Sequence, residues 1–265
     1  MDLERIVITG ASRGIGEAIA YRLARRGRRL LLLARTERDL ERVSRRARGQ
    51  GADVEYRCVD LARPEQVEQL VGELERDFGP VDALVLNAGV ANQRSFFETD
   101  LASIDYELRV NFEAPAVFLR HVVRQMIERN RGSVAVVGSL TSVVPFPGNA
   151  SYAASKAALQ ALVRSLRLEL ASTNVHLGLV LPGFTATPMT EGMTSALPAM
   201  SADQVARAVE RCLTARRPFV VPGLINKVGL RLFSAAPALT DAVLARLSSP
   251  RLARRWRRTL WPRVS

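Results

Sequence analysis

The chain has 265 residues, 48% of them hydrophobic, which suffices for one α/β domain with a substantial core. Its two cysteines, Cys58 and Cys212, lack metal-ligand spacing, so we expect no metal site and no disulfide scaffold, but reduced thiols in a cytoplasmic setting. No signal-peptide pattern and no run of roughly 18 apolar residues occurs, so we expect neither a cleaved leader nor a membrane span.

The net charge of +12 is concentrated toward the C-terminus. Residues 216–265 carry eleven Lys or Arg side chains and only Asp241 as an acid, whereas the first 215 residues are nearly neutral. We expect no nucleic-acid partner, because no recognised binding motif accompanies the charge. The basic segment therefore needs an explanation of its own.

Apolar runs alternate with helical patterns along most of the chain. We expect strands at 6–9, 29–34, 54–59, 82–86, 134–138, 176–181 and, at a sheet edge because of its prolines, 218–222. Helices are expected up to about residue 26, at 37–49, 64–78, 152–172 and 203–216, and as one or two helices over 101–131, interrupted around Asn111 and Pro115. This alternation predicts an α/β fold, a doubly wound and mostly parallel Rossmann sheet of about seven strands with helices on both faces.

The first strand leads into a glycine-rich turn, Gly10-Ala-Ser-Arg-Gly-Ile-Gly16, which an amphipathic helix follows. Glycines let the backbone approach a pyrophosphate, and the N-terminus of the next helix offers free N–H groups and the positive end of its dipole. Because the glycines stand between a strand and a helix, the turn predicts a dinucleotide site.

The end of the second strand indicates which dinucleotide is bound. An acid there hydrogen-bonds the ribose of NAD, whereas a nearby arginine accommodates the 2′-phosphate of NADP. Here the strand ends in Ala34-Arg35-Thr36 without an acid, and Arg13 of the glycine turn is placed to join Arg35. NADP(H) is favoured, with two ordinary surface arginines as the alternative.

Polar and small residues follow three further strands, where ligands bind in open parallel sheets. They are Asp60-Leu61, Asn87-Ala88-Gly89 and Pro182-Gly183. Asp60 suits an adenine amino group or, equally well, a helix cap or a loop acid before Pro64.

The stretch from Ser139 to Lys156 carries the proton chemistry. Tyr152 and Lys156 stand four residues apart in a helical pattern, and therefore on one face. A fixed ammonium beside a phenol lowers the phenol's pKa from about 10 toward neutral, which makes Tyr152 a candidate proton donor or acceptor. Ser139 can reach the same point from the preceding strand. Lys156 and Lys227 are the only lysines in an arginine-rich chain, which favours a specific need for an ammonium at 156 over an ordinary solvated lysine.

Taken together and in this order, the motifs resemble the short-chain dehydrogenase/reductase family in its compact single-domain form, over roughly residues 5–222. Leu86 stands where the family usually has another Asn. The resemblance implies a catalytic set of Asn111, Ser139, Tyr152 and Lys156. It implies a cofactor-binding set of Gly10, Ser12, Arg13, Gly14, Ile15, Gly16, Arg35, Asp60, Leu61, Asn87, Ala88, Gly89, Tyr152, Lys156, Pro182, Gly183, Thr185 and Thr187.

What the resemblance implies is hydride transfer between NADPH and a carbonyl carbon. Tyr152 would give the proton, Ser139 would stabilise the oxygen, Lys156 would hold the nicotinamide ribose, and Asn111 would position a water. Two alternatives stay open: an idle NADP(H)-binding regulatory protein on the same fold, and a dehydrogenase working in the oxidative direction.

The residues expected at the substrate are mostly apolar, which favours a hydrophobic ketone or 3-oxoacyl chain. They are Val90, Phe96, Val143, Val144, Phe146, Phe184, Met189 and Met193.

Residues 223–265 extend past the catalytic domain expected over 1–222. With Trp256 and Trp261 among arginines, the extension resembles a helix lying on an anionic membrane surface. An arm packed over the substrate cleft or a dimer contact is the alternative. A homodimer is expected from the family resemblance, with a tetramer possible.

Overall fold

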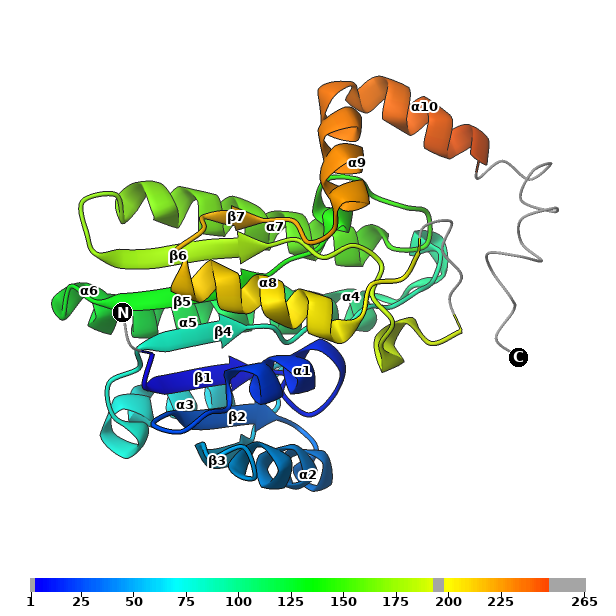
Figure 1. Cartoon of the computed structure of the whole chain (residues 1–265). Helices are drawn as coiled ribbons and strands as arrows, with labels where there is room; N and C mark the ends of the chain where they lie inside the picture. The colour runs from blue at the N-terminus through cyan, green and yellow to red at the C-terminus, as the bar shows by residue number, and fades with distance from the viewer. Residues whose placement is uncertain (1–2, 193–197, 248–265) are drawn as a thin grey trace.

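The computed structural model describes residues 3–192 and 198–247, and the statements below concern those residues. Seven parallel strands form one sheet in the order β3-β2-β1-β4-β5-β6-β7 (Figure 1). The strands are β1 Arg5–Thr9, β2 Arg29–Ala34, β3 Asp53–Cys58, β4 Ala83–Leu86, β5 Gly132–Val137, β6 Val175–Val180 and β7 Phe219–Val220. The doubly wound α/β fold predicted from the alternation is confirmed, with β7 at the sheet edge but shorter than expected.

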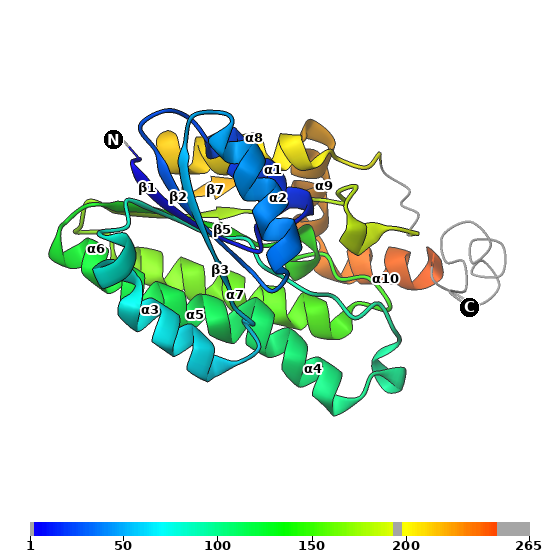
Figure 2. The same cartoon turned by 90° about the horizontal axis from the view of Figure 1, so that it is seen from below.

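Helices cover both faces of the sheet (Figures 1 and 2). One face carries α1 Gly14–Leu23, α2 Glu37–Arg48 and α8 Ala202–Thr214. The other carries α3 Pro64–Phe78, α4 Leu101–Leu108, α5 Ala114–Phe118, α6 Arg124–Glu128 and α7 Ala150–Glu169. Strand side chains alternate between two buried clusters: Ile6 and Ile8 pack with the first group, and Val7 with the second.

The interruption expected around Asn111 and Pro115 is not a break. Residues 101–128 form one helical stretch in which π-helical segments, Arg109–Glu113 and Leu119–Val123, alternate with α-helix. The N–H of Ala114 bonds the carbonyl of Arg109, five residues back. Pro115 has no N–H to offer Asn111 four residues earlier, which the π-helical spacing accommodates.

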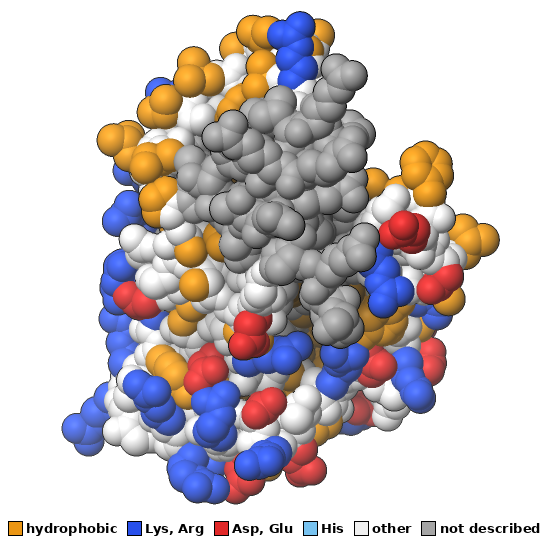
Figure 3. All heavy atoms as spheres, turned by 90° about the vertical axis from the view of Figure 1, so that its right-hand side faces the viewer, with side chains coloured by type: hydrophobic (Ala, Val, Ile, Leu, Met, Phe, Trp, Pro, Cys, Tyr) orange, Lys and Arg blue, Asp and Glu red, His pale blue; other side chains and the backbone are white. Residues whose placement is uncertain are grey.

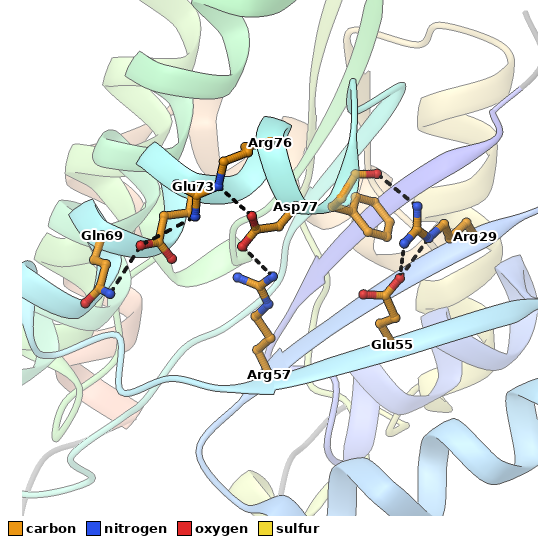
Figure 4. Close-up of polar contacts among 8 residues, drawn as sticks. Arg29, Glu55, Arg57, Gln69, Glu73, Arg76 and Asp77 are labelled. Atoms are coloured by element: carbon orange, nitrogen blue, oxygen red, sulfur yellow. Dashed lines mark hydrogen bonds and ion pairs between the residues drawn. The ribbon is translucent and has the colours of Figure 1, made fainter.

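Ion pairs join arginines and acids of neighbouring elements in the body of the chain. Arg29 on β2 bonds Glu55 on β3 and the carbonyl of Phe78 at the end of α3 (Figure 4). Arg57 on β3 bonds Asp77 on α3 at 2.9 Å. Such partly exposed pairs contribute only about 0–1 kcal/mol each, so they pair charge more than they stabilise the fold.

Two further helices, α9 Leu224–Ala235 and α10 Pro237–Leu247, lie beyond the carboxyl ends of the strands (Figure 1). Among the described helices, none taken singly has the length and apolar composition to cross a membrane. α9 and α10 pass that test only as a pair, and they meet at an angle of 109°.

The stability of this fold should depend on pH through His176 of β6. Burial and the charge of Arg216 lower the pKa of His176 to about 4, so the folded chain keeps this ring neutral. Below about pH 6.5 the unfolded chain takes up the proton first, and the unfolding free energy should fall by about 2 kcal/mol between pH 7.5 and pH 5.

Urea unfolding at several pH values measures this fall. In His176→Phe the fall should shrink by that amount, whereas His121→Phe, a change at an exposed histidine, should leave it unchanged. An identical pH dependence in His176→Phe and the natural chain would contradict the assignment.

Candidate active site

A cavity opens at the carboxyl ends of β1, β4, β5 and β6. Its polar lining includes Asn87, Ser139, Tyr152, Lys156 and Thr187, which come from four separate parts of the chain. Parallel strands place their carboxyl ends on one edge of the sheet, so these residues meet although they lie up to a hundred positions apart.

The glycine turn between β1 and α1 is tight. Gly10 has φ +66°, and a Cβ there would lie 2.8 Å from the Cα of Ala88. A Cβ on Gly16 would lie 2.0 Å from the carbonyl oxygen of Gly10. Only glycine fits at either position without a shift of the neighbouring backbone. The N-cap residue Arg13 makes no side-chain hydrogen bond to the start of α1, so the N–H groups there are open to a phosphate.

A hydrogen-bonded cluster ties this turn to the segment after β4. The hydroxyl of Thr9 accepts from the N–H groups of Asn87 at 3.0 Å and Ala88 at 3.1 Å. The Asn87 side chain donates in return to the carbonyls of Thr9 at 3.1 Å and Gly10 at 3.3 Å. The glycine turn and the Asn-Ala-Gly segment therefore form one unit, at the point where the strand order reverses.

Lys156 is buried in the second turn of α7. Its ammonium donates to the carbonyl of Val137 at 3.3 Å and lies 5.9 Å from the centre of the Tyr152 ring. Burial lowers the pKa of Lys156 to about 8. The side-by-side arrangement predicted from the four-residue spacing is present.

The pKa of Tyr152 differs from the expectation. Burial raises it above its ordinary value, a hydrogen bond with Ser139 opposes the rise, and the negative charge of Glu107 adds to it. The lowering predicted from the neighbouring ammonium is not found in the protein chain itself. Desolvation of the phenolate outweighs the attraction of an ammonium that is turned toward Val137.

Asn111 does not line the cavity. Its side chain accepts from the Val90 N–H at 2.9 Å and donates to the Val90 carbonyl at 2.8 Å and to Ser155 at 3.0 Å. Asn111 thus fixes the segment after Gly89 against α7. Its expected role of positioning a water stays a prediction.

Two polar side chains, one beside the cavity and one in its lining, were not predicted. Glu107, only 2% exposed, accepts from the N–H of Asn92, while its second oxygen has no hydrogen-bond partner among the described residues. Asn149 lines the cavity, and its buried Oδ1 likewise lacks a partner there. The only sequence signal for Glu107 was its place one helical turn before Asn111, on the same face.

Basic side chains surround the outer end of the glycine turn. Arg13 and Arg35 are exposed and follow the adjacent strands β1 and β2, whose residues Thr9 and Leu33 are paired. Arg35 donates to the hydroxyl of Tyr106 and lies over its ring at 6.0 Å.

Arg42 on α2 adds a guanidinium that the sequence did not indicate. It donates to the Ser12 carbonyl at 3.1 Å and pairs with Glu17. Asp60 is partly exposed, and its carboxylate accepts from the Ala62 N–H at 3.1 Å. It is therefore a loop acid and not a helix cap, because the N-cap of α3 is Arg63.

Only some of the residues expected at the substrate line the cavity. Val144, Phe146, Phe184 and Met189 line the cavity, as do the expected cofactor residues Ile15, Asn87, Gly89, Pro182, Gly183, Thr185 and Thr187. Val143 and Val90 instead pack against the core, and Phe96 is exposed on a short turn away from the cavity lining. Met193 lies outside the described residues.

Helix α9, predicted as part of an extension outside the catalytic domain, contributes to the cavity. Ile225, Gly229 and Phe233, four residues apart, line it together with Asn226 and Leu230. The apolar pattern of this segment was visible in the sequence. That one side of the helix would line the cavity was not.

Residues 4–198 match the sequence model of the family described as short chain dehydrogenase. The chain belongs to this family of oxidoreductases. A similar curated protein, 11-beta-hydroxysteroid dehydrogenase A of Arachis hypogaea, is 37% identical over 206 residues, which cover 77% of this chain. The chain spans only 58% of that relative's length.

Solved structures share the fold over most of the chain. A short-chain dehydrogenase from Sphingobium yanoikuyae in complex with NADPH has a TM-score of 0.80 and 29% identity, covering 91% of this chain and 96% of that one. A short chain dehydrogenase/reductase from Burkholderia phymatum in complex with NAD also has a TM-score of 0.80, with 25% identity over 90% of this chain and 95% of that one. Both dinucleotides thus occur among similar proteins.

Proposed function

We propose that the chain is an NADPH-dependent carbonyl reductase for a hydrophobic ketone or 3-oxoacyl-type substrate. The observation that carries this is the meeting of Ser139, Tyr152 and Lys156 in one cavity with the Asn87 and Pro182-Gly183 strand ends. Apolar side chains make up the rest of its wall, which suits a substrate with much apolar surface. The similarity to a protein named as a steroid dehydrogenase supports the same class.

The residues fit a dinucleotide. No side chain caps the start of α1, so its N–H groups would hold a pyrophosphate. Lys156, next to Gly89 in the cavity, would hold the nicotinamide ribose. The chemistry that NADPH supplies when bound is a hydride for the carbonyl carbon.

Tyr152 donates its phenolic proton to the carbonyl oxygen as negative charge develops there. Its raised pKa keeps the phenol protonated at neutral pH, as a proton donor in reduction requires. Thr141 donates to the Ser139 oxygen through both its N–H and its hydroxyl, so the hydrogen of Ser139 is directed to another acceptor. Ser139 therefore stabilises the same oxygen that Tyr152 protonates.

Tyr152→Phe tests the proton donor. Removing the hydroxyl should lower kcat by at least about a thousandfold, because the phenol is the group that gives its proton to the carbonyl oxygen. NADPH binding should change by less than about threefold, measured by fluorescence titration, since the ring is kept. Turnover within about tenfold of the natural chain, against a panel of ketones, would refute the assignment.

The preference for NADP(H) over NAD(H) rests on Arg13 and Arg35 and on the absence of an acid at the end of β2. Arg35→Asp should lower the ratio of kcat/KM with NADPH to that with NADH by about a hundredfold, since it removes an attraction for the 2′-phosphate and adds a repulsion. Arg120→Asp, at an exposed position on the opposite side of the sheet, is the matched control. An unchanged ratio in Arg35→Asp would show that Arg35 does not recognise the 2′-phosphate.

We further propose a homodimer through α4 and α7. Both helices expose a large leucine, Leu101 on α4 and Leu168 on α7. Sedimentation equilibrium should give twice the chain mass of 29.1 kDa, and Leu101→Asp with Leu168→Asp should shift it toward one chain. A single-chain mass for the natural protein would contradict this proposal.

A further inference from the structure

Helices α9 and α10 carry a concentration of exposed apolar side chains. Seven of the fifteen large apolar side chains found exposed among the described residues belong to these two helices. They are Leu224, Ile225, Val228, Leu232, Phe233, Leu239 and Val243. Figure 3 shows apolar side chains gathered at the end of the molecule where these helices lie. Monomeric soluble proteins rarely expose so many apolar side chains in one place. These seven residues, called here the α9–α10 face, therefore indicate a surface that contacts another molecule or a membrane.

α9 is apolar on two sides. Ile225, Gly229 and Phe233 line the cavity, and at its rim Ile225 and Phe233 are also exposed and belong to the α9–α10 face. Leu224, Val228 and Leu232, one position earlier in each turn, do not line the cavity and are exposed. The same helix therefore forms the rim of the cavity and the exposed face, so whatever covers this face lies at the cavity entrance.

The two helices are held at the angle they make. The Thr240 hydroxyl donates to the carbonyls of Phe233 and Ala236, both at 3.1 Å. Asn226 fixes the start of α9 by donating to the Pro222 carbonyl at 3.0 Å. A pair bent by 109° and anchored at the cavity fits a surface on which it lies better than a bilayer that it crosses.

The charge of this part of the chain selects among possible partners. Residues 224–265 hold nine Lys or Arg side chains and one acid, and the eighteen residues after Leu247 include six arginines and two tryptophans. A two-fold contact between copies through this face would bring the exposed Lys227, Arg231 and Arg246 of one copy toward those of the other, which like charges oppose. An anionic surface pairs with these charges while it takes up the apolar side chains.

We propose that the α9–α10 face docks on an anionic lipid surface, so that the cavity beside it takes its hydrophobic substrate from the lipid. The docking is inferred from the exposed apolar and basic residues of α9 and α10 alone, whereas the delivery of substrate rests on the reductase function proposed above.

Co-sedimentation of the full chain with vesicles tests the docking. The chain should sediment with phosphatidylcholine vesicles that contain about 30% phosphatidylglycerol, weakly with phosphatidylcholine alone, and less at about 500 mM than at about 50 mM salt. Val228→Asp with Leu232→Asp, at positions 49% and 67% exposed, should lower the partition coefficient by at least about tenfold. Ile127→Asp, 43% exposed on α6 at the other end of the sheet, should leave it unchanged.

The same samples are assayed for NADPH oxidation with a water-soluble ketone. Activity of the double variant should stay within about twofold, because neither side chain lines the cavity. A chain that reduces the ketone yet sediments with neither vesicle overturns the docking and leaves the reductase. A chain that binds anionic vesicles but oxidises NADPH with no ketone overturns the function and leaves the docking. Equal sedimentation of the double variant and the natural chain shows that another surface binds, and overturns the proposal.

Discussion

The site depends on the hydrogen-bonded cluster of Thr9, Asn87 and Ala88 between β1 and β4. One buried hydroxyl satisfies two backbone N–H groups, and the Asn87 amide satisfies two carbonyls of the glycine turn. Without it, the two loops that leave the sheet on either side of the strand reversal would carry unpaired polar groups and separate. The cluster therefore sets the distance between the place for a pyrophosphate and the cavity with Tyr152.

Burial acts on the two titratable groups of the cavity in opposite directions and with one result. It raises the pKa of Tyr152 and lowers that of Lys156, so each group is pushed toward its neutral form. A neutral phenol is a donor, and a lysine with a pKa near 8 can exchange its proton at the pH of a cell. Burial thus strengthens the hold of Tyr152 on its proton and weakens that of Lys156, so the two groups differ in how readily they release a proton at neutral pH.

The sequence was informative wherever structure is local. Apolar runs and turn residues predicted the seven strands, and the glycine spacing predicted the tight turn, because each depends on a few neighbouring residues. Glu107, Arg42 and the cavity-facing side of α9 were not predictable, since their roles arise from contacts between distant elements. The direction in which the Tyr152 pKa shifts was also not predicted. A four-residue spacing shows which charge is near the phenol but not how far burial removes water from it.

Lysine is confined to two positions, Lys156 and Lys227. The first is buried, whereas the second is exposed on α9. Apart from the α-amino group, amine-directed acylating reagents therefore meet a single accessible side chain, and it stands on the helix that forms the rim of the cavity. One covalent label or surface attachment at that amine reports on the entrance to the site without a single engineered residue.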